Sequence, residues 1–271
     1  MTGMRRPYQT DVSSEIWELI RPFIETEQTN GRPREDGILR EVVNALFYMD
    51  RTGCQWNMIP HDLPPKSTVW YLFSKWKKDG VLKQILDQAN RTARVAAGRD
   101  ESPSLGIVDS QSVKTAHGGD EIGFDAFKRV KGRKRHLFVD IMGLLFAVVV
   151  TAANVPDGKI LVPLTEKVEA IHPRLEAVLA DGAYGIANYP SVFAQRFQDR
   201  ETPLHLQISK KDPDQKGFKV IPKRWVVERT NAWNGNSRRL SKDYERTVAS
   251  SEAFVIIAAI ARTGRALSTP S

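Results

Sequence analysis

The sequence predicts an α/β protein in which a mixed sheet flanked by helices follows a small all-helical domain. Three observations predict this class. Apolar residues recur at helical spacing through the first hundred residues, a small polar linker spans residues 96–104, and short aliphatic segments then alternate with helical ones. We therefore place a helical domain at 1–97 and a second domain at 104–271. The length of 271 residues is enough for two domains.

Four helices are expected in the first domain. The first begins at Ser13 or Ser14, and the second runs from Ile38 to about Arg51. The third is aromatic-rich and opens at Ser67 or Thr68, and the fourth runs from residue 81 to about residue 97. Short helices joined by turns that contain Gly or Pro fit a DNA-binding module of the helix-turn-helix type. A plain helical bundle fits the same pattern.

The second domain shows strands and helices in a mixed order. Residues 105–109, 135–140, 144–151, 175–181 and 203–208 are expected as strands, and residues 159–171, 187–199, 224–244 and 250–267 as helices. The turn Met142-Gly143 joins two of the strands as a hairpin. This order is typical of an α/β domain.

Composition excludes several classes of protein. Apolar residues make up 41% and charged residues 27% of the chain, which is too apolar for a disordered chain. Cys54 is the one cysteine, so no disulfide scaffold or cysteine zinc cluster is expected. The longest apolar run, Leu144 to Val150, is too short for a membrane span, and the first residues do not resemble a signal peptide. We therefore expect a cytoplasmic protein with no membrane partner.

The net charge of +8 favours a polyanionic partner. The densest basic run is 128–135, with six basic residues: Lys128, Arg129, Lys131, Arg133, Lys134 and Arg135. Such a run either contacts DNA phosphates or is simply a solvated face.

Two aspartates each end an aliphatic strand. Asp109 follows Leu105-Gly106-Ile107-Val108, and Asp181 follows a similar run. Ligand groups in open α/β sheets cluster just beyond strand ends, so the two carboxylates would lie close together and need a cation such as Mg²⁺ or Mn²⁺. Alternatively, each aspartate caps a turn.

Glu228 is the candidate third carboxylate. On the expected helix at 224–244, Glu228 shares a face with Arg224, Asn231 and Arg239, away from the apolar stripe that includes Val226 and Trp233. Glu228 is then either a metal ligand flanked by phosphate-binding arginines or half of a solvated Arg–Glu pair.

Four motifs in order resemble bacterial insertion-sequence transposases of the DDE type, in the insertion-sequence-five family. They are Ile107-Val108-Asp109-Ser110-Gln111-Ser112, Lys131-Gly132-Arg133-Lys134-Arg135-His136, Ala180-Asp181-Gly182-Ala183-Tyr184 and Trp225-Val226-Val227-Glu228-Arg229-Thr230. The segment Arg238-Arg239-Leu240-Ser241-Lys242-Asp243-Tyr244 and the Gly, Trp and Pro pattern of residues 52–70 also fit this family. The resemblance covers nearly the whole chain.

The resemblance implies an RNase-H-like domain in which Asp109, Asp181 and Glu228 hold two Mg²⁺ ions, with Mn²⁺ as a substitute. It implies cleavage at terminal inverted repeats and attack of the freed 3′-hydroxyl on target double-stranded DNA, by a homodimer or larger assembly at the bacterial nucleoid. The DNA-binding candidates are Lys128, Arg129, Lys131, Arg133, Lys134, Arg135, Arg224, Arg229, Arg238, Arg239 and Lys242.

Three alternatives remain at this stage. One is a degenerate or repurposed transposase that binds DNA without strand transfer. Another is a nuclease of the same fold. The third is a carbohydrate hydrolase with two carboxylates, which would leave the basic run without a role.

Overall fold

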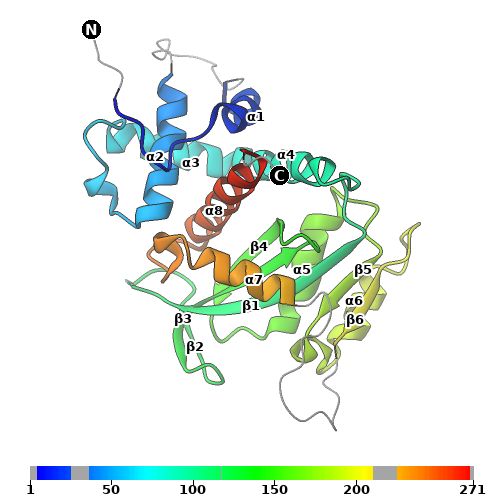
Figure 1. Cartoon of the computed structure of the whole chain (residues 1–271). Coiled ribbons are helices and arrows are strands. Elements are labelled where there is room, and N and C mark those ends of the chain that lie inside the picture. The colour runs from blue at the N-terminus through cyan, green and yellow to red at the C-terminus, as the bar shows by residue number, and fades with distance from the viewer. Residues whose placement is uncertain (1–4, 26–36, 117, 210–224, 269–271) are drawn as a thin grey trace. The chain divides into compact units, whose positions relative to one another are not determined.

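A computed structural model describes residues 5–25, 37–116, 118–209 and 225–268 (Figure 1). These residues form two compact units. The helical unit comprises the described residues within 1–97, 234–241 and 253–271, and the sheet unit comprises those within 98–233 and 242–252. The helical unit therefore also contains residues 234–241 and 253–268, which the expected domain at 104–271 included.

The helical unit is built from short helices around an aromatic core. Its elements are α1 (Ser14–Glu25), α2 (Ile38–Thr52), η1 (Trp56–Met58), α3 (Lys66–Lys78), α4 (Val81–Ala96), η3 (Arg238–Leu240) and the part of α8 (Val248–Ser268) from residue 253 onward. The Phe254 ring on α8 lies 5.2 Å from the Phe73 ring and 6.1 Å from the Trp56 ring. Burial of these rings explains why the end of the chain joins this unit. The four predicted N-terminal helices are confirmed.

The sheet unit contains the remaining elements. They are β1 (Leu105–Lys114), β2 (Gly123–Asp125), β3 (Val130–Val139), β4 (Leu145–Ala152), α5 (Asp157–Glu169), β5 (Ala177–Ala180), η2 (Gly182–Gly185), α6 (Tyr189–Arg196), β6 (His205–Ile208) and α7 (Trp225–Asn234). The strands form one sheet in the order β2-β3-β1-β5-β6, and β4 also pairs with β3. Pairings among β1, β3 and β4 are antiparallel, whereas β5 and β6 continue parallel to β1. The predicted α/β class with a mixed, RNase-H-like sheet is confirmed.

The turn between β3 and β4 is held by one side chain. Asp140 Oδ1 accepts hydrogen bonds from the Met142 and Leu144 N–H groups at 2.9 and 3.0 Å. Gly143 has a φ of 83°, a left-handed conformation that glycine adopts at no steric cost. The predicted hairpin is confirmed. The helix α5 packs against β4, β3 and β1 and covers the sheet.

The expected helix at 224–244 is much shorter in the structure. α7 ends at Asn234, where the chain turns at Asn234-Gly235 before the short η3. Asn234 Oδ1 accepts a hydrogen bond from Arg262 Nη1 at 3.3 Å, and an Asn-Gly pair favours a turn over a helix. Arg239 therefore does not continue the face of Glu228.

No helix in the described ranges has the length and apolarity that crossing a bilayer requires.

Candidate active site

The register of two parallel strands brings two carboxylates side by side. Ile107 on β1 pairs with Leu179 on β5. Two residues further along each strand come Asp109 and Asp181. Because neighbouring strands lie about 4.8 Å apart, this register places the two aspartates next to each other where β5 ends. Asp181 also caps η2, since its Oδ1 accepts a hydrogen bond from the Ala183 N–H at 2.9 Å.

Two other acids act on the pKa of Asp109. The pKa of Asp109 is raised to about 6, mainly by burial and further by the negative charges of Asp181 and Glu228. The Ser110 N–H and the Lys128 ammonium act in the opposite direction. Like charges shift a pKa in this way only at short range. Asp181 and Glu228 therefore both act electrostatically on Asp109.

The helix α7 is docked on the β3–β4 turn. Thr230 Oγ1 donates to the Gly143 carbonyl at 3.1 Å, and Arg229 Nη2 donates to the Met142 carbonyl at 3.0 Å. The Arg229 guanidinium also lies 4.5 Å from the ring centres of both Trp225 and Trp233. These contacts fix the rotation of α7 and turn the face of Glu228 toward β1.

Asn231 is a site residue that the sequence did not single out. Its Nδ2 donates to Asp109 Oδ2 at 3.1 Å. Asn231 and Glu228 are three residues apart on α7, so both side chains lie on one face. The signal was present in the sequence, because the predicted face of Glu228 already included Asn231. The sequence did not show that this face of α7 lies opposite Asp109 on β1.

Tyr184 is a second residue that sequence reasoning missed. The ring is 1% exposed, and no described residue forms a hydrogen bond with its hydroxyl. Burial raises the pKa of this phenol, and the charges of Asp157, Asp109 and Asp181 raise it further. A neutral, buried phenol therefore lies near the two aspartates.

The donor atoms of the site suit a hard divalent cation. Carboxylate and amide oxygens are the ligands that Mg²⁺ and Mn²⁺ prefer. Asn231 Oδ1 is buried and accepts no hydrogen bond from any described residue, so an unsatisfied oxygen lies next to the acids. Across the described ranges, no three His, Cys, Asp or Glu side chains are grouped closely enough to hold one ion. The residues fit a metal chemically, but the described side chains do not form a complete metal site.

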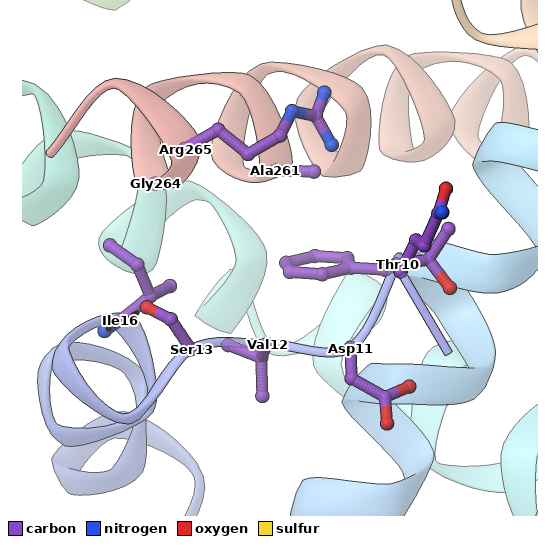
Figure 2. A pocket seen from close by; sticks show the side chains of 10 residues that line it. Thr10, Asp11, Val12, Ser13, Ile16, Ala261, Gly264 and Arg265 are labelled. Atoms are coloured by element: carbon purple, nitrogen blue, oxygen red, sulfur yellow. Dashed lines mark hydrogen bonds between the residues drawn. The ribbon is translucent and has the colours of Figure 1, made fainter. Parts of the chain in front are cut away.

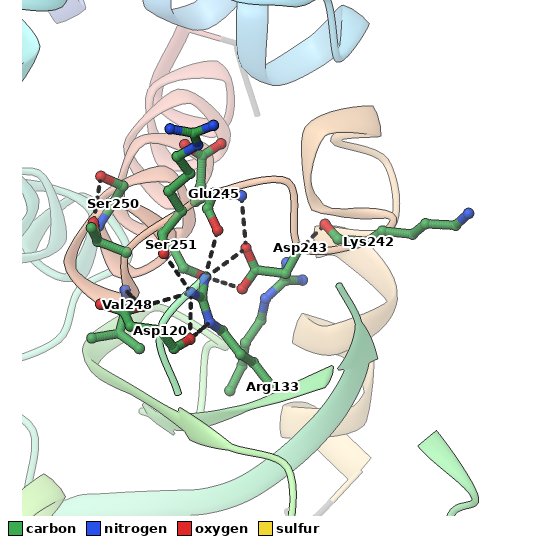
Figure 3. A network of polar contacts seen from close by, with 11 residues as sticks. Asp120, Arg133, Lys242, Asp243, Glu245, Val248, Ser250 and Ser251 are labelled. Atoms are coloured by element: carbon green, nitrogen blue, oxygen red, sulfur yellow. Dashed lines mark hydrogen bonds and ion pairs between the residues drawn. The ribbon is translucent and has the colours of Figure 1, made fainter. Parts of the chain in front are cut away.

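Half of the basic run at 128–135 is buried, and here the predicted DNA contacts are not supported. Arg133 is fully buried and bonds to Asp120 and Asp243 and to the carbonyls of Glu245 and Arg246, as Figure 3 shows for this network. Lys134 pairs with Asp157 at 2.8 Å. Arg135 is 1% exposed and donates to the Lys242 carbonyl at 3.2 Å. All three side chains lie on β3 and are buried. Carboxylates and backbone carbonyl oxygens of the protein itself compensate their positive charges.

The other basic candidates differ in exposure. Lys128, Arg129, Lys131, Arg238 and Lys242 are exposed. Arg229 is half-buried between its two tryptophans. Arg239 is buried in the helical unit, where its Nη1 donates to the Cys54 carbonyl at 2.7 Å, so a DNA contact is not supported for it either. Arg224 lies outside the described residues.

A separate hollow lies in the helical unit. Its volume is about 240 Å³, and its lining includes Asp11, Ser13, Ile16, Phe47 and Arg265 (Figure 2). None of the residues that line it belongs to the carboxylate site.

Comparison with known proteins identifies the family. The family described as "Putative transposase of IS4/5 family" matches residues 12–86, and the family described as "Transposase DDE domain" matches residues 100–263. A relative from Burkholderia cepacia, named "Putative transposase for insertion sequence element IS402", is 32% identical over 131 residues. That match covers 46% of this chain and 59% of the relative. The second family match extends over more than half of the chain and contains Asp109, Asp181 and Glu228. The chain therefore belongs to the transposases with a DDE domain.

Proposed function

We propose that this chain is the transposase of an insertion sequence. It cuts double-stranded DNA at the terminal inverted repeats of the element and joins the freed 3′-hydroxyl to target DNA. The observation that carries the proposal is the register that sets Asp109 beside Asp181, together with the charge of Glu228 acting on Asp109. The family match and the IS402 relative support the same reading.

Asp109, Asp181 and Glu228 would together hold two divalent metal ions. We expect Mg²⁺ as the physiological ion and Mn²⁺ as a substitute. Bound divalent ions would supply an activated oxygen nucleophile and stabilise the leaving oxygen of an in-line displacement at phosphorus. Asn231 would hold the Asp109 carboxylate in one orientation through its 3.1 Å hydrogen bond.

The DNA backbone would be held by exposed basic side chains. In the sheet unit these are Lys128, Arg129, Lys131 and Lys242. Phosphate contacts position a duplex without reading its sequence. We assign recognition of the element ends to the helical unit, including Arg238, and expect a homodimer or larger assembly on DNA at the bacterial nucleoid. Arg133, Lys134, Arg135 and Arg239 keep a structural role.

The test uses the full chain, Mg²⁺ and a duplex carrying the two ends of the element that encodes it. Cleavage is followed on denaturing gels, and strand transfer by joined products with a plasmid target. We expect Asp181→Asn and Glu228→Gln to lower the cleavage rate about a thousandfold, since metal-assisted charge stabilisation supplies several kcal/mol.

Asp199→Asn is the matched control, because Asp199 is an exposed acid of the same unit. It should cut like wild type. Undiminished cutting by the Asp181 and Glu228 variants would refute the assignment of the site. Binding of the ends with no cleavage by wild type would instead identify a DNA-binding protein without strand transfer.

A further inference from the structure

One aromatic ring of the sheet unit lies almost wholly in solvent. Phe127 is 95% exposed, and Phe124, nearby in the same hairpin, is 55% exposed. Both belong to the hairpin formed by β2 and the start of β3, whose turn is Ala126–Arg129 (Figure 1). Two large apolar side chains left in water on one short hairpin gain nothing for folding, which points to a binding partner.

The turn is held in a defined conformation. Asp125 Oδ1 accepts hydrogen bonds from the Phe127 and Lys128 N–H groups at 3.1 and 2.9 Å. Its other oxygen accepts from Ser112 Oγ on β1 at 2.6 Å. Arg129 has a φ of 52°, which is uncommon for a residue other than glycine. Phe127 is thus presented on a braced and locally strained turn, as binding residues often are.

The surroundings of Phe127 are basic. Lys128 and Arg129 follow it directly, and both are exposed. Beside them a groove of about 530 Å³ is lined by Lys114, Arg129, Lys131 and Phe124, together with Thr115, Gly118 and Ile122. Among the described residues that line the groove, three are cationic and none is a carboxylate. Its charge is complementary to a nucleic-acid backbone.

The hairpin is tied to the carboxylate site. Lys128 Nζ donates to the Ser110 carbonyl at 3.1 Å, and Ser110 is the residue after Asp109. The turn that carries Phe127 is therefore linked to the residue next to Asp109.

We propose that the β2–β3 hairpin is a DNA-distorting wedge, in which Phe127 inserts into the base stack next to the cleavage site while Lys114, Arg129 and Lys131 hold the backbone along the groove. The inference rests on the proposed function and deepens it. Apolar wedges of this kind unstack base steps, and flanking cations offset the cost through phosphate contacts. Protein–protein contact is less favoured, because charged residues are depleted from the centres of such interfaces.

The experiment measures distortion apart from cleavage. Full-length protein is bound, without divalent metal, to a duplex of the element end that carries 2-aminopurine at successive terminal positions. Unstacking raises the fluorescence of this base. We expect an increase with wild type at one or two positions, and its loss with Phe127→Ala. Affinity should fall about tenfold to a hundredfold, the range for removing one base-stacking aromatic side chain. Phe127→Trp should restore both signals.

Val192→Ala is the matched control, because Val192 is another exposed apolar side chain of the sheet unit, on α6. It should behave like wild type. Equal fluorescence with Phe127→Ala and wild type, or no increase with either, overturns the wedge. A change of oligomeric state in Phe127→Ala with unchanged fluorescence also overturns it, in favour of a protein interface. Distortion by wild type without cleavage in Mg²⁺ refutes the proposed function but supports the wedge.

Discussion

Two aspartates, one in each unit, share a raised pKa of about 6 in opposite surroundings. In the helical unit, burial alone raises the pKa of Asp50. The Ser237 hydroxyl, which donates a hydrogen bond to Asp50 at 2.7 Å, lowers this pKa, and so do the charges of Arg265, Arg51 and Arg239. In the sheet unit, the pKa of Asp109 is raised by burial and, in addition, by the negative charges of Asp181 and Glu228.

The difference separates a structural acid from a functional one. Three arginines of the protein lie around Asp50, so their positive charges compensate the negative charge of this carboxylate. Around Asp109 the other strong charges are mostly negative, so compensation has to come from a bound cation. A raised pKa alone therefore does not locate an active site; the sign of the neighbouring charges does.

The largest effect is expected when the charge of Asp50 is removed. Its folded pKa of about 6 lies above the ordinary value, so the folded state binds the proton more tightly and stability falls as pH rises between about 4 and 6. Asp50→Asn abolishes that loss and should raise the free energy of unfolding at about pH 8 by up to about 3 kcal/mol, with no gain below about pH 4. Urea unfolding at both pH values measures it. A variant that is less stable at about pH 8 would mean that the three arginines outweigh burial.

The second largest effect is expected from Mg²⁺ binding, which should depend on Asp109 and not on Asp50. Binding of Mg²⁺ to the folded state at about a hundred times its Kd adds about 2.7 kcal/mol to the free energy of unfolding. We expect a rise of Tm with Mg²⁺ for wild type and Asp50→Asn, and none for Asp109→Asn. Calorimetric titration of Mg²⁺ into the same three proteins provides an independent reading. If Asp109→Asn is stabilised like wild type, the cation binds elsewhere.

The smallest effect concerns the amide that orients Asp109. Asn231→Ala removes the hydrogen bond to Asp109 Oδ2, and loss of such an orienting partner typically costs about 10- to 100-fold in metal affinity. The Mg²⁺ concentration for half-maximal cleavage should rise accordingly, while the rate at saturating metal changes less. Asn231→Gln keeps the amide group and tests whether its position matters. An unchanged Mg²⁺ requirement in Asn231→Ala would show that the hydrogen bond does not position Asp109.

Much of the fold was predictable because its signals are local. Apolar spacing and turn residues placed the helices and the β3–β4 hairpin correctly. The aliphatic runs before Asp109 and Asp181 predicted two strands that end at these carboxylates. β5 does end next to Asp181, but β1 continues to Lys114, so Asp109 lies within its strand and that end was wrong. The long helix at 224–244 was wrong, since periodicity continued through Asn234-Gly235 while the backbone turned there.

The charged residues were the least predictable. Arg133 and Lys128 belong to the same basic run, yet Arg133 is fully buried and Lys128 is exposed. The residues that neutralise Arg133 are Asp120 and Asp243, and Asp243 lies 110 residues away in the chain. A sequence shows the charge of such a residue but not the remote residue that neutralises it.

The sequence by itself determined the fold class, most of the helices and the β3–β4 hairpin, and it singled out the three candidate acids, because each depends on neighbouring residues or on a recognisable family motif. Only the tertiary structure decided the environments of those side chains. It buried Arg133, Lys134 and Arg135, joined Asn231 to Asp109, left Phe127 in solvent and moved the end of the chain into the helical unit. Burial and electrostatic energy depend on distance in space, and long-range contacts set those distances.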